Sequence, residues 1–268
     1  MNISIATHLT TVLKLSYDGD GSSLYTIRVY NSHKRLVTSK TTTNTYVTIH
    51  DTFPTGFYTV DVCTEKKTHT VHSVVPAMFR LSSGGCGFLM SGFPFGLDFP
   101  VLVTAFHCVR SKDNVPLITC HFETASVQPD ASIFWAHSER YKDGGIDYCV
   151  MGISDKDVTK LRAKNIFPHE MSYEGFTKNN IGLLCHLNIA NGNKMLKTVC
   201  NIVERNASSA RYVYEPNFPN SSSGSSGSPM FGLTHDNKLT VQGLHIGSGK
   251  CTMGSSIVFD IKNHLITR

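Results

Sequence analysis

The chain has 268 residues, of which 40% are hydrophobic and 17% are charged, and its formal net charge is +5. These values are typical of a globular protein with one large or two small domains and a sizeable core. No apolar run approaches the roughly 18 residues of a membrane-spanning helix, so we expect no membrane insertion by this chain. Lysine and arginine form no long runs, which indicates a solvated surface and leaves weak RNA binding as a minor hypothesis.

The eight cysteines contain no C-x-x-C pair, so the sequence argues against a zinc site. We therefore expect no metal and no organic cofactor. Several cysteines lie inside apolar runs, as in LITCHF and DYCVMGI, which is typical of small buried side chains in a reducing compartment. The first residues do not combine a basic segment with an apolar core, so we expect no signal peptide.

Strands are predicted along most of the chain, because short segments rich in β-branched and aromatic residues alternate with Gly, Asn, Asp and Pro. The first group comprises residues 11–17, 24–31, 45–50, 57–63 and 69–75. The second group comprises residues 77–82, 86–93, 100–106, 115–123, 131–138 and 148–153. The third group comprises residues 182–189, 195–203, 210–215, 228–233, 239–247 and 256–261. This pattern predicts an all-β fold of sandwiches or barrels.

The best helix candidate is the segment 154–165, for which Ser154 is a suitable N-cap, and a short helix is expected at residues 262–268. The polar stretch around 154–180 separates the second and third groups of strands. We therefore predict three domains, namely an N-terminal β-rich accessory domain and two barrels. Their predicted bounds are 1–72, 73–160 and 161–268.

Three stretches carry residues suited to nucleophilic catalysis. His107 follows an apolar strand in VLVTAFHCV, and Asp147 opens an otherwise apolar strand in GGIDYCVMGI. Ser226 lies between glycines in GSSGSP, on what the sequence predicts to be a tight turn. A serine hydroxyl needs a base, and the base needs a group that holds its tautomer, so these three residue types form a working set if they meet in space. Asp143, in a Gly-rich turn, is the rival acid.

The three stretches together resemble the motifs of chymotrypsin-like serine proteases. TAFHC is similar to their histidine motif, IDYCVMGI to their aspartate strand, and GSSGSP to their G-x-S-G-[GS]-P nucleophile motif. The resemblance covers about residues 76–268 and implies two six-stranded antiparallel barrels with the active site between them. It implies that Ser226 is the nucleophile, His107 the general base and acid, and Asp147 the orienting carboxylate. The backbone N–H groups of Gly224 and Ser226 would form the oxyanion hole.

The sequence departs from the cellular enzymes of this family at two points. These enzymes carry Asp immediately before the nucleophile, where it pairs with a newly cut N-terminus, whereas this chain has Ser225. We therefore expect activity without that switch. The secreted enzymes often pair the cysteines that correspond to Cys86 and Cys108, but the other usual pairs are missing here, so we favour free thiols.

The segment after the nucleophile resembles that of the 3C-like proteases of positive-strand RNA viruses. Their G-x-H-x-G segment lines the primary specificity pocket, and GLHIG implies the same role for His245 and Gly247. Ser221 stands five residues before the nucleophile, where those enzymes have Thr or Ser, and Asn220 replaces the Asp that binds Lys or Arg in trypsin-like enzymes. A hydroxyl and an imidazole both donate to a side-chain carbonyl, so we expect cleavage after Gln, with Glu second.

With serine rather than cysteine as the expected nucleophile, the sequence resembles the serine-type 3C-like enzymes of nidoviruses, astroviruses and sobemoviruses. The resemblance implies an endopeptidase that acts on viral polyprotein peptides in the host cell cytoplasm, near membrane-bound replication complexes. Two alternatives stay open. One is a cellular trypsin-like protease, which predicts a signal peptide, disulfides and an activation site; the other is a protease-fold module that binds RNA or protein. The N-terminal domain fits an immunoglobulin-like interaction domain, a brace for the barrels or a polyprotein neighbour, and the sequence predicts no oligomeric state.

Overall fold

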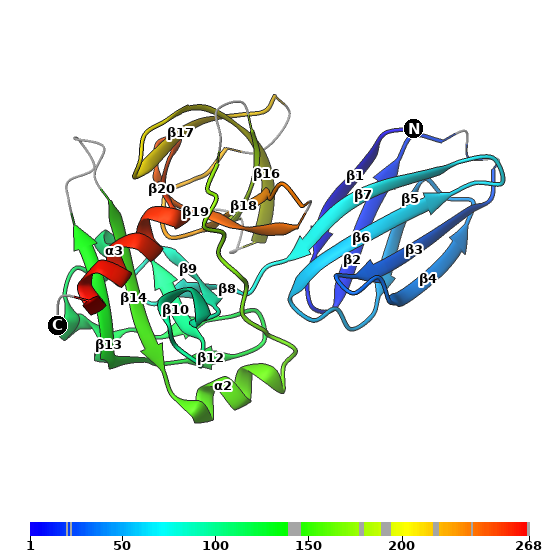
Figure 1. Ribbon diagram of the computed structural model, residues 1–268. Coiled ribbons are helices and arrows are strands. Elements are labelled where there is room, and N and C mark those ends of the chain that lie inside the picture. The colour runs from blue at the N-terminus through cyan, green and yellow to red at the C-terminus, as the bar shows by residue number, and fades with distance from the viewer. Residues whose placement is uncertain are drawn as a thin grey trace. The chain divides into compact units, whose positions relative to one another are not determined.

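The structure is a computed structural model (Figure 1). It describes residues 1–19, 21, 23–138, 146–176, 180–188, 194–216, 220–236 and 238–266. The chain divides into two compact units. The first consists of Met1–Pro76 with Asn165–Phe167, and the second of Ala77–Lys164 and Pro168–Arg268.

The first unit is a sandwich of two antiparallel sheets with the strand orders β1-β2-β5 and β4-β3-β6-β7. Its strands are β1 (Ile3–His8), β2 (Val12–Tyr17), β3 (Tyr25–Asn31), β4 (Leu36–Thr42), β5 (Tyr46–His50), β6 (Gly56–Cys63) and β7 (Thr68–Val75). Seven consecutive strands divided in this way between two facing sheets form an immunoglobulin-like sandwich. An immunoglobulin-like domain is one of the forms that the sequence left open for this region.

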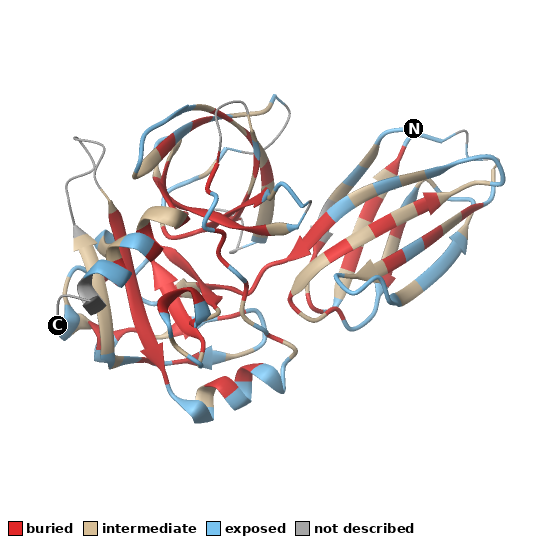
Figure 2. Cartoon of the chain, viewed as in Figure 1, coloured by how far each residue is buried: buried red, intermediate tan, exposed pale blue. Residues whose placement is uncertain are grey.

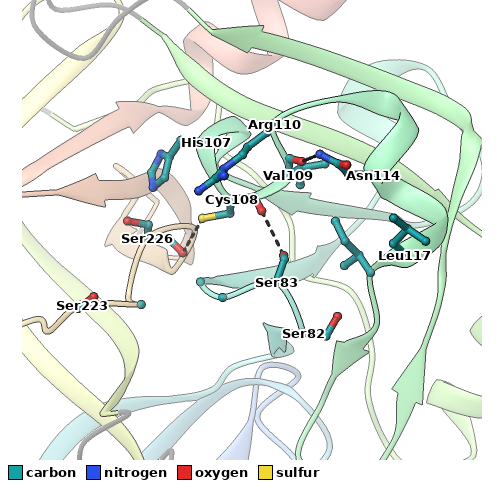
Figure 3. A pocket seen from close by; sticks show the side chains of 14 residues that line it. Ser82, Ser83, His107, Cys108, Val109, Arg110, Asn114, Leu117, Ser223 and Ser226 are labelled. Carbon is teal, nitrogen blue, oxygen red and sulfur yellow. Dashed lines mark hydrogen bonds between the residues drawn. The ribbon is translucent and has the colours of Figure 1, made fainter.

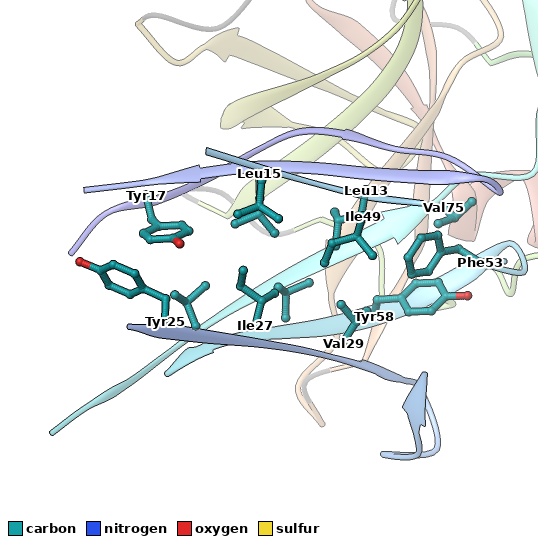
Figure 4. Packing of buried hydrophobic residues seen from close by; sticks show 13 residues of the cluster. Leu13, Leu15, Tyr17, Tyr25, Ile27, Val29, Ile49, Phe53, Tyr58 and Val75 are labelled. Atoms are coloured by element: carbon teal, nitrogen blue, oxygen red, sulfur yellow. The ribbon is translucent and has the colours of Figure 1, made fainter. Parts of the chain in front are cut away.

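The core of the sandwich follows from alternation along its strands. Burial in β2 alternates between intermediate and buried, so Leu13 and Leu15 share one face. They pack with Ile27 of β3 and Val60 of β6 in a single apolar cluster, and Figure 4 shows the side chains of the two sheets facing one another. The edge strand β4 was missed from the sequence, because its side chains are mostly exposed and show no apolar face.

The second unit begins with an antiparallel sheet of the order β12-β11-β8-β9-β10-β14-β13. Its strands are β8 (Met78–Leu81), β9 (Cys86–Met90), β10 (Val101–Thr104), β11 (Cys120–His121), β12 (Ser126–Val127), β13 (Pro129–Ser138) and β14 (Asp147–Ile153). The two end strands of this order, β12 and β13, are linked by Gln128 alone. One residue spans at most about 7 Å between the flanking Cα atoms, so the sheet curls until its two ends meet.

The other half of this unit is a closed barrel of the order β15-β16-β17-β20-β19-β18. Its strands are β15 (Ile181–Asn188), β16 (Lys194–Arg205), β17 (Ser209–Tyr214), β18 (Pro229–Leu233), β19 (Leu239–Gly247) and β20 (Lys250–Met253). Phe176, Leu184, Tyr212 and Met230 are among the residues of its apolar core. The expected all-β architecture with an additional N-terminal β-rich unit is confirmed.

The helices are short and lie between or after the strands. They are η1 (Phe93–Phe95), α1 (Phe106–Val109), η2 (Lys112–Leu117), α2 (Asp155–Arg162) and α3 (Gly254–Ile266). The expected N-cap of α2 is present, since the side chain of Ser154 accepts a hydrogen bond from the backbone N–H of Asp157. None of the helices in the described part of the chain has the length and apolar character needed to cross a membrane.

The predicted strand at residues 256–261 is wrong, because this segment lies in α3 and the sixth barrel strand is β20. Ile257 and Ile261 are fully buried, whereas Phe259 between them is 68% exposed. All three would share one face of a strand, but a helix separates Phe259 from the other two. The predicted strand at 115–123 is also mostly wrong, because Pro116 lies in η2 and only β11 remains extended.

Candidate active site

The serine-rich segment before β18 is an ordered double turn. The N–H of Ser225 donates to the carbonyl of Ser222, and the N–H of Ser228 donates to the carbonyl of Ser225, both at 3.1 Å. Gly227 has a φ of +89°, and a Cβ at this position would lie 1.9 Å from the carbonyl oxygen of Cys86. The turn therefore requires glycine at this position. Although the Ser- and Gly-rich composition is typical of a flexible linker, this segment forms a tightly packed loop.

Ser226 occupies the outer position of this loop. Its carbonyl accepts a 2.7 Å hydrogen bond from the N–H of Cys86, which ties the loop to β9. The side chain of Ser226 is partly exposed and lines two cavities. Within the described residues, the N–H groups of Gly224 and Ser226 form no protein hydrogen bond, so both are available to a ligand.

The neighbouring Ser225 has a different environment. It is fully buried, its Oγ accepts a 3.3 Å hydrogen bond from the N–H of Ser222, and this hydroxyl donates to the carbonyl of Leu187 at 3.5 Å. Ser225 thus fastens the loop to β15 and does not face the cavities. Of the two serines, only Ser226 lines the cavities.

His107 and Asp147 form a hydrogen-bonded pair at two points. Nδ1 of His107 lies 2.6 Å from Oδ2 of Asp147, and the backbone N–H of His107 donates to Oδ1 at 3.2 Å. In this hydrogen bond Nδ1 carries the proton, so Nε2 is the acceptor whenever the imidazole is neutral. The hydrogen bond to Asp147 raises the pKa of His107 above its usual value, the thiol of Cys108 raises it further, and burial opposes both effects.

Asp147 is held by its position at the start of β14. Its side chain is 9% exposed, whereas that of His107 is 47% exposed. Its backbone N–H donates to Oγ1 of Thr252 at 3.2 Å, and the same hydroxyl donates to the carbonyl of Asp147 at 3.2 Å. Thr252 belongs to β20, so this residue links the first sheet to the closed barrel beside the catalytic candidates. Asp143, the rival acid, lies outside the described residues.

A cavity of about 620 Å³ lies beside His107 and Ser226, which both line it (Figure 3). The thiol of Cys108 lies 3.8 Å from the carbonyl of Ser226, and the thiol of Cys86 donates to the carbonyl of Gly224 at 3.2 Å. Both cysteines are free. Burial raises the pKa of Cys86 to about 11, so its sulfur stays protonated and is no competing nucleophile.

A second cavity of about 480 Å³ reaches Ser226 from the other side. Its lining residues include Asn220, Ser221, His245 and Gly247, which the sequence assigned to the specificity pocket. No Asp, Glu, Lys or Arg is among the described residues that line it, and these residues are polar and uncharged.

Two tyrosines that the sequence analysis missed organise this second cavity. The hydroxyl of Tyr212 lies 2.5 Å from Nδ1 of His245, and the hydroxyl of Tyr214 is hydrogen-bonded to Oγ of Ser221. Burial lowers the pKa of His245 to about 4 and raises that of Tyr212 well above 10, so both groups are neutral near pH 7. The alternation in RYVY, which places both tyrosines on one face of β17, is the signal that points to them.

The structure thus brings the sequence-predicted residues together. His107, Gly224 and Ser226 line the first cavity, and Ser221, His245 and Gly247 line the second, which also includes Gly224 and Ser226. In the described part of the chain, no group of three or more His, Cys, Asp or Glu side chains is arranged to hold a metal ion. The two cavities share the loop residues Ser223, Gly224 and Ser226.

Comparison with known proteins finds no matching family and no matching curated sequence. Among solved structures, kallikrein-related peptidase 10 is similar with a TM-score of 0.50 and 11% identity, over 72% of this chain and 97% of that one. The NS6 protease from murine norovirus 1 has a TM-score of 0.42 and 14% identity, over 66% and 88% of the two chains. An inactive serine-to-alanine mutant of Rv3671c from M. tuberculosis has a TM-score of 0.46 and 12% identity, over 72% of this chain and 87% of that one.

At such low identities, structural likeness shows the fold alone. The fold is that of the chymotrypsin-like serine proteases, as the sequence predicts, and the likeness to kallikrein-related peptidase 10 carries this assignment. The roles of individual residues, the bond that is cut and the biological setting need arguments from this chain's own geometry.

Proposed function

We propose that this protein is a serine endopeptidase in which Ser226 is the nucleophile, His107 the general base and acid, and Asp147 the orienting carboxylate. The observation that carries the proposal is the 2.6 Å contact between His107 and Asp147 beside a cavity that Ser226 also lines. Asp147 fixes the imidazole with Nε2 as the acceptor, which is the tautomer that takes a proton from a serine hydroxyl. The unpaired N–H groups of Gly224 and Ser226 supply the second requirement, a site for the oxyanion.

In the proposed reaction, Oγ of Ser226 attacks the carbonyl carbon of the scissile peptide while Nε2 of His107 accepts the hydroxyl proton. The carbonyl π electrons move to oxygen, which is stabilised by the N–H groups of Gly224 and Ser226. The C–N bond then breaks, its electron pair stays on nitrogen, and His107 protonates the departing amine. Water activated by His107 hydrolyses the acyl-enzyme through the same steps, which releases the acid and restores Ser226.

The proposed mechanism is tested by labelling with a serine-directed phosphonate, followed by mass spectrometry of the proteolytic fragments. We expect a single adduct on Ser226, and no adduct in the Ser226→Ala protein. We also expect chelators to leave peptide cleavage unaffected, since the proposed residues need no metal. An adduct on another serine would contradict the assignment, and an unlabelled but folded protein with tight, salt-sensitive RNA binding would favour a binding module.

We further propose that cleavage follows Gln, with Glu second. The neutral His245 and the hydroxyl of Ser221 line the uncharged cavity next to Ser226. If Tyr212 donates to Nδ1 of His245, the imidazole proton lies on Nε2 and is available to the side-chain carbonyl of Gln. Because the described lining of the cavity includes Asn220 and no carboxylate, it offers Lys and Arg no counter-charge.

Peptides that differ only at the residue before the scissile bond test this specificity. We expect Leu and Phe to be rejected by about 10³-fold, because they leave the pocket donors unpaired. The preference for Gln over Glu should hold near neutral pH and weaken only as the pH falls toward about 4, where His245 becomes protonated. His245→Ala should abolish the Gln preference while phosphonate labelling of Ser226 continues. Preferential cutting after Arg, Lys or a large apolar residue would contradict the proposed pocket.

The biological setting is proposed from the G-x-H-x-G segment and the serine nucleophile. We propose that the substrates are viral polyprotein segments and that the enzyme acts in the host cell cytoplasm near membrane-bound replication complexes. The free cysteines and Asn220 count against the alternative of a cellular trypsin-like protease. Profiling against a peptide library decides between them, because the trypsin-like alternative predicts cleavage after Arg or Lys.

A further inference from the structure

The two cavities that meet at Ser226 have different places in the proposed reaction, on which this inference rests. His107 protonates the departing amine, so the chain that follows the scissile bond must pass within hydrogen-bonding reach of His107. The cavity of about 620 Å³ is lined by His107, whereas the cavity with Ser221 and His245 is not. The larger cavity is therefore the one available to the leaving-group side of the substrate.

Arg110 gives this cavity a positive charge. It is the only Lys or Arg among the described residues that line the cavity, and the lining contains no Asp or Glu. In Figure 3 its side chain extends back past Cys108 toward His107 and Ser226. Within the described chain its guanidinium takes part in no ion pair, in contrast to Arg211, which pairs with Glu204. Among the described residues, Arg110 is thus a cation without a counter-charge in the lining of this cavity.

The backbone of Arg110 is strained. It follows α1 with φ 71° and ψ −33°, and its N–H donates to the carbonyl of Phe106 at 2.7 Å. Glycine adopts a positive φ at this point of a helix without steric cost, whereas arginine does not. Strained non-glycine residues concentrate at functional sites, where the surrounding structure holds them. The second cavity contains a comparable residue, Ser248, with φ 49°.

We propose that the larger cavity binds the residue immediately after the scissile bond and that Arg110 selects an acidic side chain, Asp or Glu, at that position. The carboxylate forms a charge-assisted hydrogen bond with the guanidinium, which Gln or Ala cannot match. The aliphatic part of a Glu side chain packs toward Leu117, which lines the same cavity and is 79% exposed. Lys at this position is repelled by Arg110.

The test uses fluorogenic peptides that keep Gln before the scissile bond and carry Glu, Gln, Ala or Lys after it. For the unaltered protein we expect kcat/KM to be about tenfold higher for Glu than for Gln, as a charge-assisted hydrogen bond implies. Arg110→Gln should bring this ratio close to one, Arg110→Lys should leave part of it, and Arg110→Glu should reverse the order in favour of Lys. Arg162→Gln, an exposed change on α2 outside both cavities, is the matched control and should preserve the ratio.

Two further measurements separate the outcomes. Raising the salt concentration should shrink the Glu preference of the unaltered protein, because a partly exposed charge pair is screened. Thermal unfolding shows whether each variant is folded, and the opposite expectations for Arg110→Lys and Arg110→Glu keep the test decisive if one of the variants is unstable. Equal cleavage of the Glu and Gln peptides by an enzyme that is labelled at Ser226 would overturn this inference and leave the proposed function intact. Failure of labelling and of all cleavage would overturn both.

Discussion

At the residue scale, the candidate site depends on a few contacts between side chains that are far apart in the sequence. Asp147 is held at its backbone by Thr252 and accepts from His107 at two atoms, so the imidazole has one tautomer and one orientation. Ser225 and Ser226 are neighbours with opposite environments, one buried and bonded to Leu187, the other facing two cavities. These differences make the proposed roles testable by single substitutions.

Ser226→Ala should lower kcat by several orders of magnitude, because the members of a catalytic triad act as a unit. Ser225→Ala should cost far less activity, since it removes two long loop-anchoring hydrogen bonds, at 3.3 and 3.5 Å, and no group that lines the cavities. Steady-state hydrolysis of a Gln-containing peptide measures both effects, with thermal unfolding as the check that each protein is folded. Equal losses in the two variants would mean that the nucleophile is assigned to the wrong serine.

The dependence of activity on pH should report His107. Only the neutral imidazole accepts the proton of Ser226, and Asp147 raises the pKa of His107 above its ordinary value. Activity should therefore rise with pH and reach half of its maximum above the usual histidine value of about 6.5. Asp147→Asn should move this midpoint downward and reduce kcat by about 10⁴-fold, since the tautomer is no longer enforced. A midpoint that does not move in Asp147→Asn, or a crippling effect of Asp143→Asn instead, would contradict the pairing.

At the scale of elements, α3 shows how little a short apolar run reveals about its secondary structure. The segment 256–261 contains branched apolar residues that suit a strand, yet the barrel is closed by β20, four residues long and just before it. The burial of the side chains distinguishes a helix from a strand in this segment, since Ile261 is fully buried and Phe259 is mostly exposed. In β17, by contrast, the alternation of the sequence does reveal how the side chains are arranged. It places both tyrosines on one face of the strand, where Tyr212 points inward and Tyr214 lines the cavity that contains Ser221.

Ile261→Ala should reduce the free energy of unfolding by about 2–5 kcal/mol, because it leaves a cavity in a buried site. Phe259→Ala should change it by no more than about 0.5 kcal/mol, since the side chain is exposed and alanine favours a helix. Urea denaturation of the full chain measures both changes. Comparable losses would indicate that the two side chains share a buried face, as they would in the strand that the sequence predicted.

At the scale of the whole molecule, the chain consists of a β-sandwich and a unit with two curled sheets. The sandwich and the closed barrel each have their own apolar cluster. The cluster of the sandwich includes Leu13 and Leu15, and that of the barrel includes Leu184 and Met230. Separate cores support separate cooperative unfolding.

Calorimetry of the full chain should show two unfolding transitions. Leu15→Ala should lower the midpoint temperature of one and Leu184→Ala that of the other, because each change should reduce the free energy of unfolding of its own unit by about 2–5 kcal/mol. Both side chains are fully buried, whereas Leu24 is 59% exposed, so Leu24→Ala is the control that should shift neither midpoint. A single transition that moves in both core variants would show that the two units unfold as one.

Much of this molecule follows from the sequence by itself, because the relevant signals are local. Alternating apolar residues predict most strands, since a strand places every second side chain on the same face. The N-cap at Ser154 is likewise a property of a few neighbouring residues. The residue types of the candidate site, His107, Asp147 and Ser226, also stand out in their short motifs, although their catalytic roles stay predictions.

Only the tertiary structure decides what depends on residues that are distant along the chain. The pairing of His107 with Asp147 spans 40 positions, and the contact of Thr252 with Asp147 spans 105. The sixth barrel strand is the segment that pairs with both β17 and β19. The short segment 250–253 does so, whereas the more apolar run after it does not. The strained backbone of Arg110 and its place in the lining of the larger cavity are invisible in the sequence, because both arise from the packing of the chain around that cavity.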